Sequence, residues 1–95
     1  MLNVMRVKGR SMIPALFPYE FVVVINWPFM RFGLNDIVVI DTPQFGRVIK
    51  RICGAQKQAR FRVAGDNKFE SVTETELGWI SRNQLKGKVV WVSRP

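Results

Sequence analysis

The residues best suited to chemistry in this chain are Ser11 and Lys50, because the sequence contains no histidine. The lack of histidine excludes a Ser-His-Asp triad, a Cys-His pair and a histidine-ligated metal site. A serine nucleophile then needs another base, and a neutral lysine can take that role. Ser11 opens a Ser-Met-Ile-Pro motif, and Lys50 is the centre of an Ile-Lys-Arg motif. A third motif, Gly65-Asp66-Asn67, follows them.

Lys50 can accept a proton from a serine hydroxyl only when it is neutral, so its pKa must lie below the ordinary value of about 10.4. A strand over residues 47–52 sends successive side chains to opposite faces, which puts Lys50 on the same face as Val48 and Ile52. Apolar neighbours of this kind desolvate an ammonium group and lower its pKa. The Ser11 backbone N–H is a candidate oxyanion donor, with Met12 packed beneath the serine.

Each motif also has a purely structural interpretation. Ser11 could cap a helical turn, and Lys50 could extend from its strand to solvent. Gly65-Asp66-Asn67 could be an ordinary turn. Only their combination and order favour a Ser/Lys dyad.

The elements that must position these residues are β-strands. Turn residues separate segments with strand patterning, and two short helical turns are expected at residues 12–17 and 81–85. The sequence predicts one domain, residues 1–95, with a mainly β, antiparallel, barrel-like fold, in which Cys53 is buried. The expected strands are residues 2–8, 21–25, 37–40, 47–52, 58–64 and 89–92.

The amino-acid composition limits the classes of binding partner that can be expected. The net charge is +8, which suits anionic surfaces. The basic residues are dispersed, and no helix-turn-helix, zinc or RNA-recognition signature is present, so no nucleic acid is expected; a basic nucleic-acid-binding domain is the weaker alternative. No metal or organic cofactor is expected. The longest apolar run, residues 21–25, is too short for a membrane span, so a cytoplasmic location is expected unless an upstream membrane segment was removed.

Five segments together carry a more specific pattern. They are residues 9–16 (Gly-Arg-Ser-Met-Ile-Pro-Ala-Leu), 34–39 (Leu-Asn-Asp-Ile-Val-Val), 48–52 (Val-Ile-Lys-Arg-Ile), 65–71 (Gly-Asp-Asn followed by Ser71) and 85–89 (Leu-Lys-Gly-Lys-Val). In this order the chain resembles the signal-peptidase and LexA-like serine peptidases over residues 4–92, and the Gly-Asp-Asn box favours the signal-peptidase branch. Thr73, Glu74 and Thr75 stand where the last box of the family has Asp-Ser-Arg.

The resemblance implies a role for each matched residue. Ser11 would be the nucleophile and Lys50 the general base, and Ser71 would orient the Lys50 ammonium. The family fold is a compact antiparallel β barrel. Supporting residues would be Met12, Arg51, Gly65, Asp66 and Asn67. A peptide substrate would bind as an added β-strand. The residues flanking it would be Met5, Arg6 and Val7 on one side and Arg47, Val48 and Ile49 on the other.

The implied activity is that of a serine endopeptidase, a minimal soluble catalytic core that removes a leader or propeptide. Small relatives of this kind include proteases for nickel-type superoxide dismutase, which is one candidate substrate. The alternative is a catalytically silent peptide-binding module with the same fold. Residues 27–32, which include Trp27, Phe29 and Phe32, are suited to peripheral contact with the inner face of a membrane. The competing interpretation folds this loop onto the protein's own core.

Overall fold

The computed structural model describes residues 1–69 and 78–94, and all six predicted strands are present in it. A short seventh strand, β6, was not predicted, because two residues are too few to show a periodic pattern. The strands are β1 (Leu2–Arg6), β2 (Phe21–Ile25), β3 (Ile37–Thr42), β4 (Gly46–Gln56), β5 (Arg60–Ala64), β6 (Ile80–Ser81) and β7 (Leu85–Val92).

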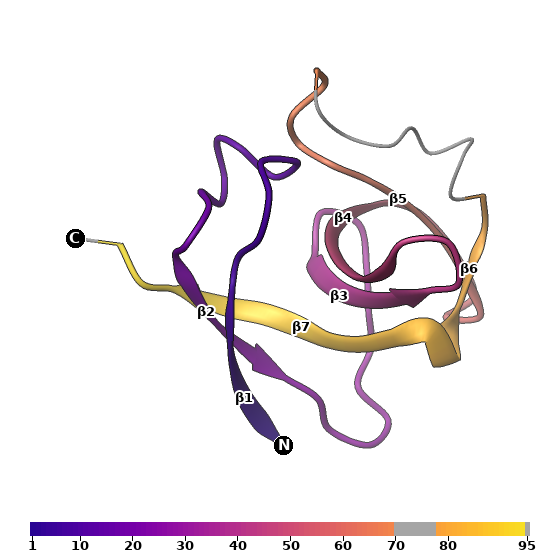
Figure 1. Cartoon of the computed structure of the whole chain (residues 1–95). Coiled ribbons are helices and arrows are strands. Elements are labelled where there is room, and N and C mark those ends of the chain that lie inside the picture. The colour runs from indigo at the N-terminus through magenta and orange to yellow at the C-terminus, as the bar shows by residue number, and fades with distance from the viewer. Residues whose placement is uncertain (70–77, 95) are drawn as a thin grey trace.

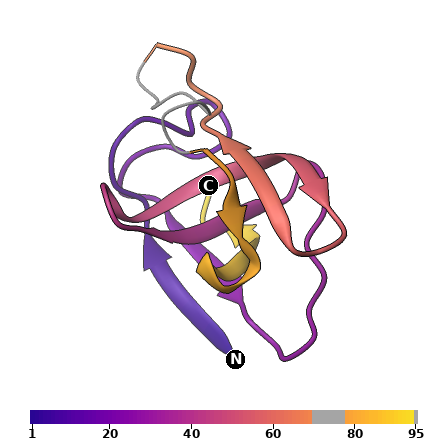
Figure 2. The same ribbon diagram turned by 90° about the vertical axis from the view of Figure 1, so that its right-hand side faces the viewer.

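The strands form one antiparallel sheet in the order β1-β2-β7-β3-β4-β5-β6. The long β7 crosses the molecule and joins the β1–β2 pair to the other strands (Figure 1). Figure 2 shows how strongly the sheet twists. The predicted barrel-like closure is wrong in this respect: within residues 1–69 and 78–94 the sheet is open, with β1 and β6 as its end strands.

Of the two predicted helical turns, one is confirmed. Arg82–Gln84 forms a 3-10 turn, η1, and the Gln84 side chain accepts a hydrogen bond from the Ser81 N–H. Residues 12–17 form successive turns instead of a helix. Their bonds include Leu16 N–H to the Met12 carbonyl, and Pro14 disfavours the helical backbone conformation at Ile13, the residue before it.

Two apolar clusters cover opposite sides of β3 and β4. The first includes Val38, Ile52 and Phe61, and the second includes Val7, Met12 and Val39. Neighbouring residues on β3 therefore both lie in a core, which explains the unbroken apolar run at residues 37–40.

The expected burial of Cys53 is wrong, since this residue is exposed. Ile52 points into the first cluster, and a strand sends successive side chains to opposite faces. The pairing of β4 with β5 also shifts register between Ile52 and Gly54, which is typical of a β-bulge at Cys53.

The two halves of β4 have different neighbours. Gly46 to Lys50 pair with β3 alone, Arg51 pairs with both β3 and β5, and Ile52 to Gln56 pair with β5. The described strands therefore leave the second edge of residues 46–50 unpaired. The outer edge of β1, the end strand, is also unpaired among them.

Candidate active site

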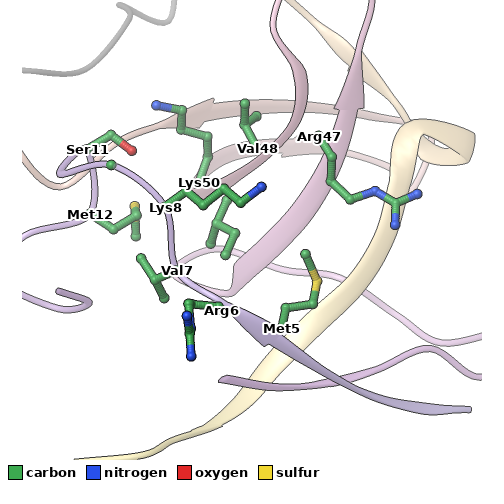
Figure 3. A pocket seen from close by; sticks show the side chains of 11 residues that line it. Met5, Arg6, Val7, Lys8, Ser11, Met12, Arg47, Val48 and Lys50 are labelled. Atoms are coloured by element: carbon green, nitrogen blue, oxygen red, sulfur yellow. The ribbon is translucent and has the colours of Figure 1, made fainter. Parts of the chain in front are cut away.

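The part of β4 that no other described strand pairs with and the edge of β1 face each other across a cavity of about 420 Å³. Residues 5–9 line one side, residues 47–50 line the other, and Ser11 and Met12 lie at one end. Sequence positions forty residues apart thus meet in one space, drawn in Figure 3.

Ser11 lies on the loop between β1 and β2, and backbone bonds hold both ends of this loop. At its base the Val7 N–H donates to the Glu20 carbonyl at 2.7 Å, and the Tyr19 N–H donates to the Val7 carbonyl at 2.9 Å. Gly9 has a φ of 74°, a conformation that costs glycine little and that turns the chain out of the strand direction before Ser11. The Ser11 residue is half-buried, and Met12 below it is 2% exposed in the second cluster.

Lys50 is 2% exposed, which is rare for a lysine. It follows the half-buried Val48 and precedes the fully buried Ile52 on its strand face, as the alternation predicts. Burial lowers the pKa of Lys50, and among the described residues no carboxylate pairs with its ammonium. Figure 3 shows the Lys50 side chain extending from β4 toward the end of the cavity that holds Ser11.

A hydrogen-bonded network ties the Gly-Asp-Asn motif to both halves of this site. Arg51 Nε and Nη2 donate to the two Asp66 carboxylate oxygens at 3.0 and 2.9 Å, and Arg51 Nη1 donates to the Asn35 carbonyl at 2.9 Å. The contact with Asp66 raises the pKa of Arg51. Asn67 donates from its backbone to the Ser11 carbonyl at 2.8 Å and from Nδ2 to the Arg10 carbonyl at 2.9 Å. Asp66 thus anchors to β4, and Asn67 to the Ser11 loop.

The structure brings most of the predicted site residues together around this cavity. Met5, Val7, Val48 and Ile49 line it with apolar atoms, together with Ser11, Met12 and Lys50. Arg6 and Arg47 also line it, but each has another partner: the Arg6 guanidinium lies 4.7 Å from the centre of the Phe21 ring, and Arg47 pairs with Asp41 at 2.9 Å.

The remaining predicted residues lie elsewhere. Gly65 is half-buried directly after β5 and does not line the cavity. Ser71, like Thr73, Glu74 and Thr75, lies outside the described residues.

Sequence reasoning missed Lys8 as a cavity residue. It ended the substrate-binding segment at Val7, although the predicted strand already included Lys8. Continuing that segment to Ser11 would have found this residue. The backbone carbonyl of Asn35, an acceptor for Arg51, was also missed, because side-chain motifs carry no information on main-chain acceptors.

No protein-family model matches the chain, and no curated protein matches it. Residues 1–69 and 78–94 contain no helix of the length and apolarity that a membrane crossing requires. The same residues contain no group of three or more histidine, cysteine, aspartate or glutamate side chains arranged to hold a metal ion.

Proposed function

We propose that this protein is a serine endopeptidase of the signal-peptidase-like kind, with Ser11 as nucleophile and Lys50 as general base. One observation carries the proposal: a half-buried serine and a buried lysine line the same cavity between two strand edges. A lysine with a lowered pKa is neutral at a lower pH than an exposed lysine and can accept the serine proton there.

The proposed reaction has two stages. Ser11 Oγ attacks the substrate carbonyl carbon while Lys50 Nζ takes the hydroxyl proton, and Lys50 then gives that proton to the leaving amine as the peptide bond breaks. A water molecule, deprotonated by Lys50, hydrolyses the acyl-enzyme and restores both residues. The Ser11 N–H is a candidate donor to the oxyanion, since its own carbonyl is already fixed by Asn67.

The substrate is proposed to bind as an extended strand, in the manner of β-strand addition. Support comes from the edges of β1 and of residues 46–50 that are unpaired within residues 1–69 and 78–94 and that flank the cavity from opposite sides. Met5, Val7 and Ile49 give the space between them apolar walls, which suits the removal of a leader or propeptide with small apolar residues near the cleavage point. Nickel-type superoxide dismutase remains one candidate substrate.

The test is cleavage by wild type, Ser11→Ala and Lys50→Ala protein in lysate of the source cell, with new N-termini read by mass spectrometry. Termini produced by wild type alone support the peptidase. The two substitutions should each abolish turnover, and their effects should not add, because the residues act as one unit. Identical profiles from all three proteins, with peptides retained by the Ser11→Ala protein, would instead support the silent peptide-binding module.

Residues 27–32 are proposed to make peripheral contact with an anionic membrane. Phe29 is 99% exposed and Trp27 is 49% exposed, whereas Phe32 folds into the first apolar cluster. The competing interpretation thus applies to Phe32 and to Met30, which packs against the same cluster. Exposed aromatic side chains on a basic protein suit a lipid interface. Wild type should sediment with anionic liposomes more than Phe29→Ser does; equal sedimentation of the two proteins would contradict the contact.

A further inference from the structure

The side chains around the cavity are unbalanced in charge. Among residues 1–69 and 78–94, eleven line the cavity; four of these are basic, namely Arg6, Lys8, Arg47 and Lys50, and none is acidic. A concave site lined by one sign of charge concentrates the field and attracts ligands of the opposite sign. The net charge of +8 adds to this potential.

The four basic side chains differ in whether another group of the protein already contacts them and in whether a ligand can reach them. Arg47 is paired with Asp41, and the Arg6 guanidinium lies over the Phe21 ring. Lys50 is buried and is needed in its neutral form. Lys8 is exposed, and no carboxylate among residues 1–69 and 78–94 pairs with it. In Figure 3 its side chain extends from the β1 side over the cavity toward β4.

Lys8 also lies close to the reacting group. It precedes Ser11 by three residues, which span at most about 10 Å at a rise of about 3.3 Å per residue. A substrate strand beside β1 would bring its own residues past Lys8 with the same spacing. We infer that the cleft selects acidic peptides, with Lys8 pairing to a carboxylate within about three residues of the scissile bond. This inference rests on the proposed function.

The test separates binding from cleavage by using the Ser11→Ala protein. The probes are short fluorescein-labelled, Ala-rich peptides that differ only in carrying Glu, Gln or Lys at the same positions. The Glu peptide should bind at least about fivefold more tightly than the Lys peptide at low salt, because Lys8 attracts the Glu carboxylate and repels the Lys ammonium, each by about twofold to fivefold. High salt should remove the difference.

Charge reversal at one residue identifies the group responsible. Lys8→Glu in the Ser11→Ala protein should abolish the preference for the Glu peptide. Lys57→Glu makes the same change in net charge at an exposed residue in the turn between β4 and β5, and it should leave the preference intact. Equal binding of the three peptides, no binding of the Glu peptide, or equal losses in both variants would overturn the inference.

The new N-termini made by wild type distinguish this inference from the proposed function. Cleavage sites without Asp or Glu within about three residues of the cut would overturn the acidic preference and leave the peptidase standing. Selective binding of the Glu peptide without any cleavage by wild type would support the acidic preference and contradict the peptidase activity.

Discussion

The two halves of β4 differ in the strands that pair with them, and the adjacent residues Lys50 and Arg51, one in each half, lie in opposite electrostatic environments. In the half that ends at Lys50, the second edge is unpaired among the described residues and lines the cavity. In the half that begins at Arg51, β5 pairs with the strand. Lys50 is buried without a carboxylate partner among those residues, and its pKa is lowered. Arg51 holds Asp66 with two hydrogen bonds, and its pKa is raised.

The difference indicates a division of roles within one strand: the half that ends at Lys50 lines the cavity, and the half that begins at Arg51 holds the structure around the cavity in place. Burying an ammonium without a carboxylate partner is energetically unfavourable, and the lowered pKa of Lys50 reflects that cost. One residue further along β4, Arg51 is held by two hydrogen bonds to Asp66, and Asn67 connects this network to the Ser11 loop through the Arg10 and Ser11 carbonyls. Each prediction below changes one half of this arrangement and measures whether the other half responds.

Lys50→Met should have the largest effect, since it removes the base and keeps an apolar side chain of similar length. Turnover should fall by at least about 10³-fold, within the range for loss of a general base. Stability should stay equal or rise, because a desolvated ammonium is gone. The two readouts are cleavage of an identified substrate and urea unfolding.

Lys50→Arg provides the matched control for charge. Arginine keeps the cation but cannot give up its proton at accessible pH, so activity should be lost as in Lys50→Met. Stability should fall, because a larger permanent cation is buried in the same place. Full activity in Lys50→Arg would contradict the role of Lys50 as general base.

The pH dependence of wild type should follow the lowered pKa of Lys50. Activity should rise about tenfold per pH unit below this pKa and level off above it. Stability has the same sign: between the lowered pKa and the ordinary value of about 10.4, the unfolded chain binds more protons, so stability rises with pH. Unfolding of wild type and Lys50→Met at several pH values isolates this term. A difference that stays constant with pH would mean that Lys50 titrates normally.

How much of this could be predicted from the sequence depends on the range of the interactions. The burial of Lys50 follows from the alternation of residues 47–52, because a strand has a period of two. The open sheet could not be predicted, because closure depends on twist and on pairing between distant edges. Pro14 disfavours helical backbone at Ile13 before it, which works against a helix after Ser11, and that signal was present in the sequence.

The candidate site shows the same limit. Met5, Val7 and Ile49 were placed at the cavity by resemblance, and the structure has them there. The partners of Arg6 and Arg47 were not predicted, because stacking on Phe21 and pairing with Asp41 depend on register between strands. Among residues 1–69 and 78–94, these two contacts leave Lys8 as the exposed basic residue of the cavity without a carboxylate or ring partner, a consequence that no single motif contains.

Arg51→Met tests the paired half of β4. The change removes the hydrogen bonds to Asp66 and to the Asn35 carbonyl, and it leaves a partly buried carboxylate without its partner. Stability should fall by about 1.5–3 kcal/mol, and activity by about tenfold as the Ser11 loop loses its support. Arg47→Met is the stability control: its pair with Asp41 is about half-exposed and screened by solvent, so its loss of stability should be much smaller. Equal losses in the two variants would remove the distinction between the halves.

Asn67→Ala should have the smallest effect. The substitution deletes the Nδ2 bond to the Arg10 carbonyl and the acceptor of the Phe69 N–H, while the backbone bond to the Ser11 carbonyl can persist. Stability should fall by about 0.5–1.5 kcal/mol and activity by only a few-fold. Asn26→Ala, at an exposed residue after β2, should change neither.

In Asn67→Ala, the loss of activity relative to the loss of stability shows whether the network of Arg51, Asp66 and Asn67 only positions Ser11 or also contacts the reacting groups. If the paired half acts only by holding Ser11 in place, activity should recover when the loop is stabilised by lower temperature, and the KM should change less than kcat. A loss of turnover as deep as that of Lys50→Met, with unfolding unchanged, would mean that Asn67 contacts the reacting groups. The residues that act on the substrate and those that only hold the site in place would then not be separated between Lys50 and Arg51.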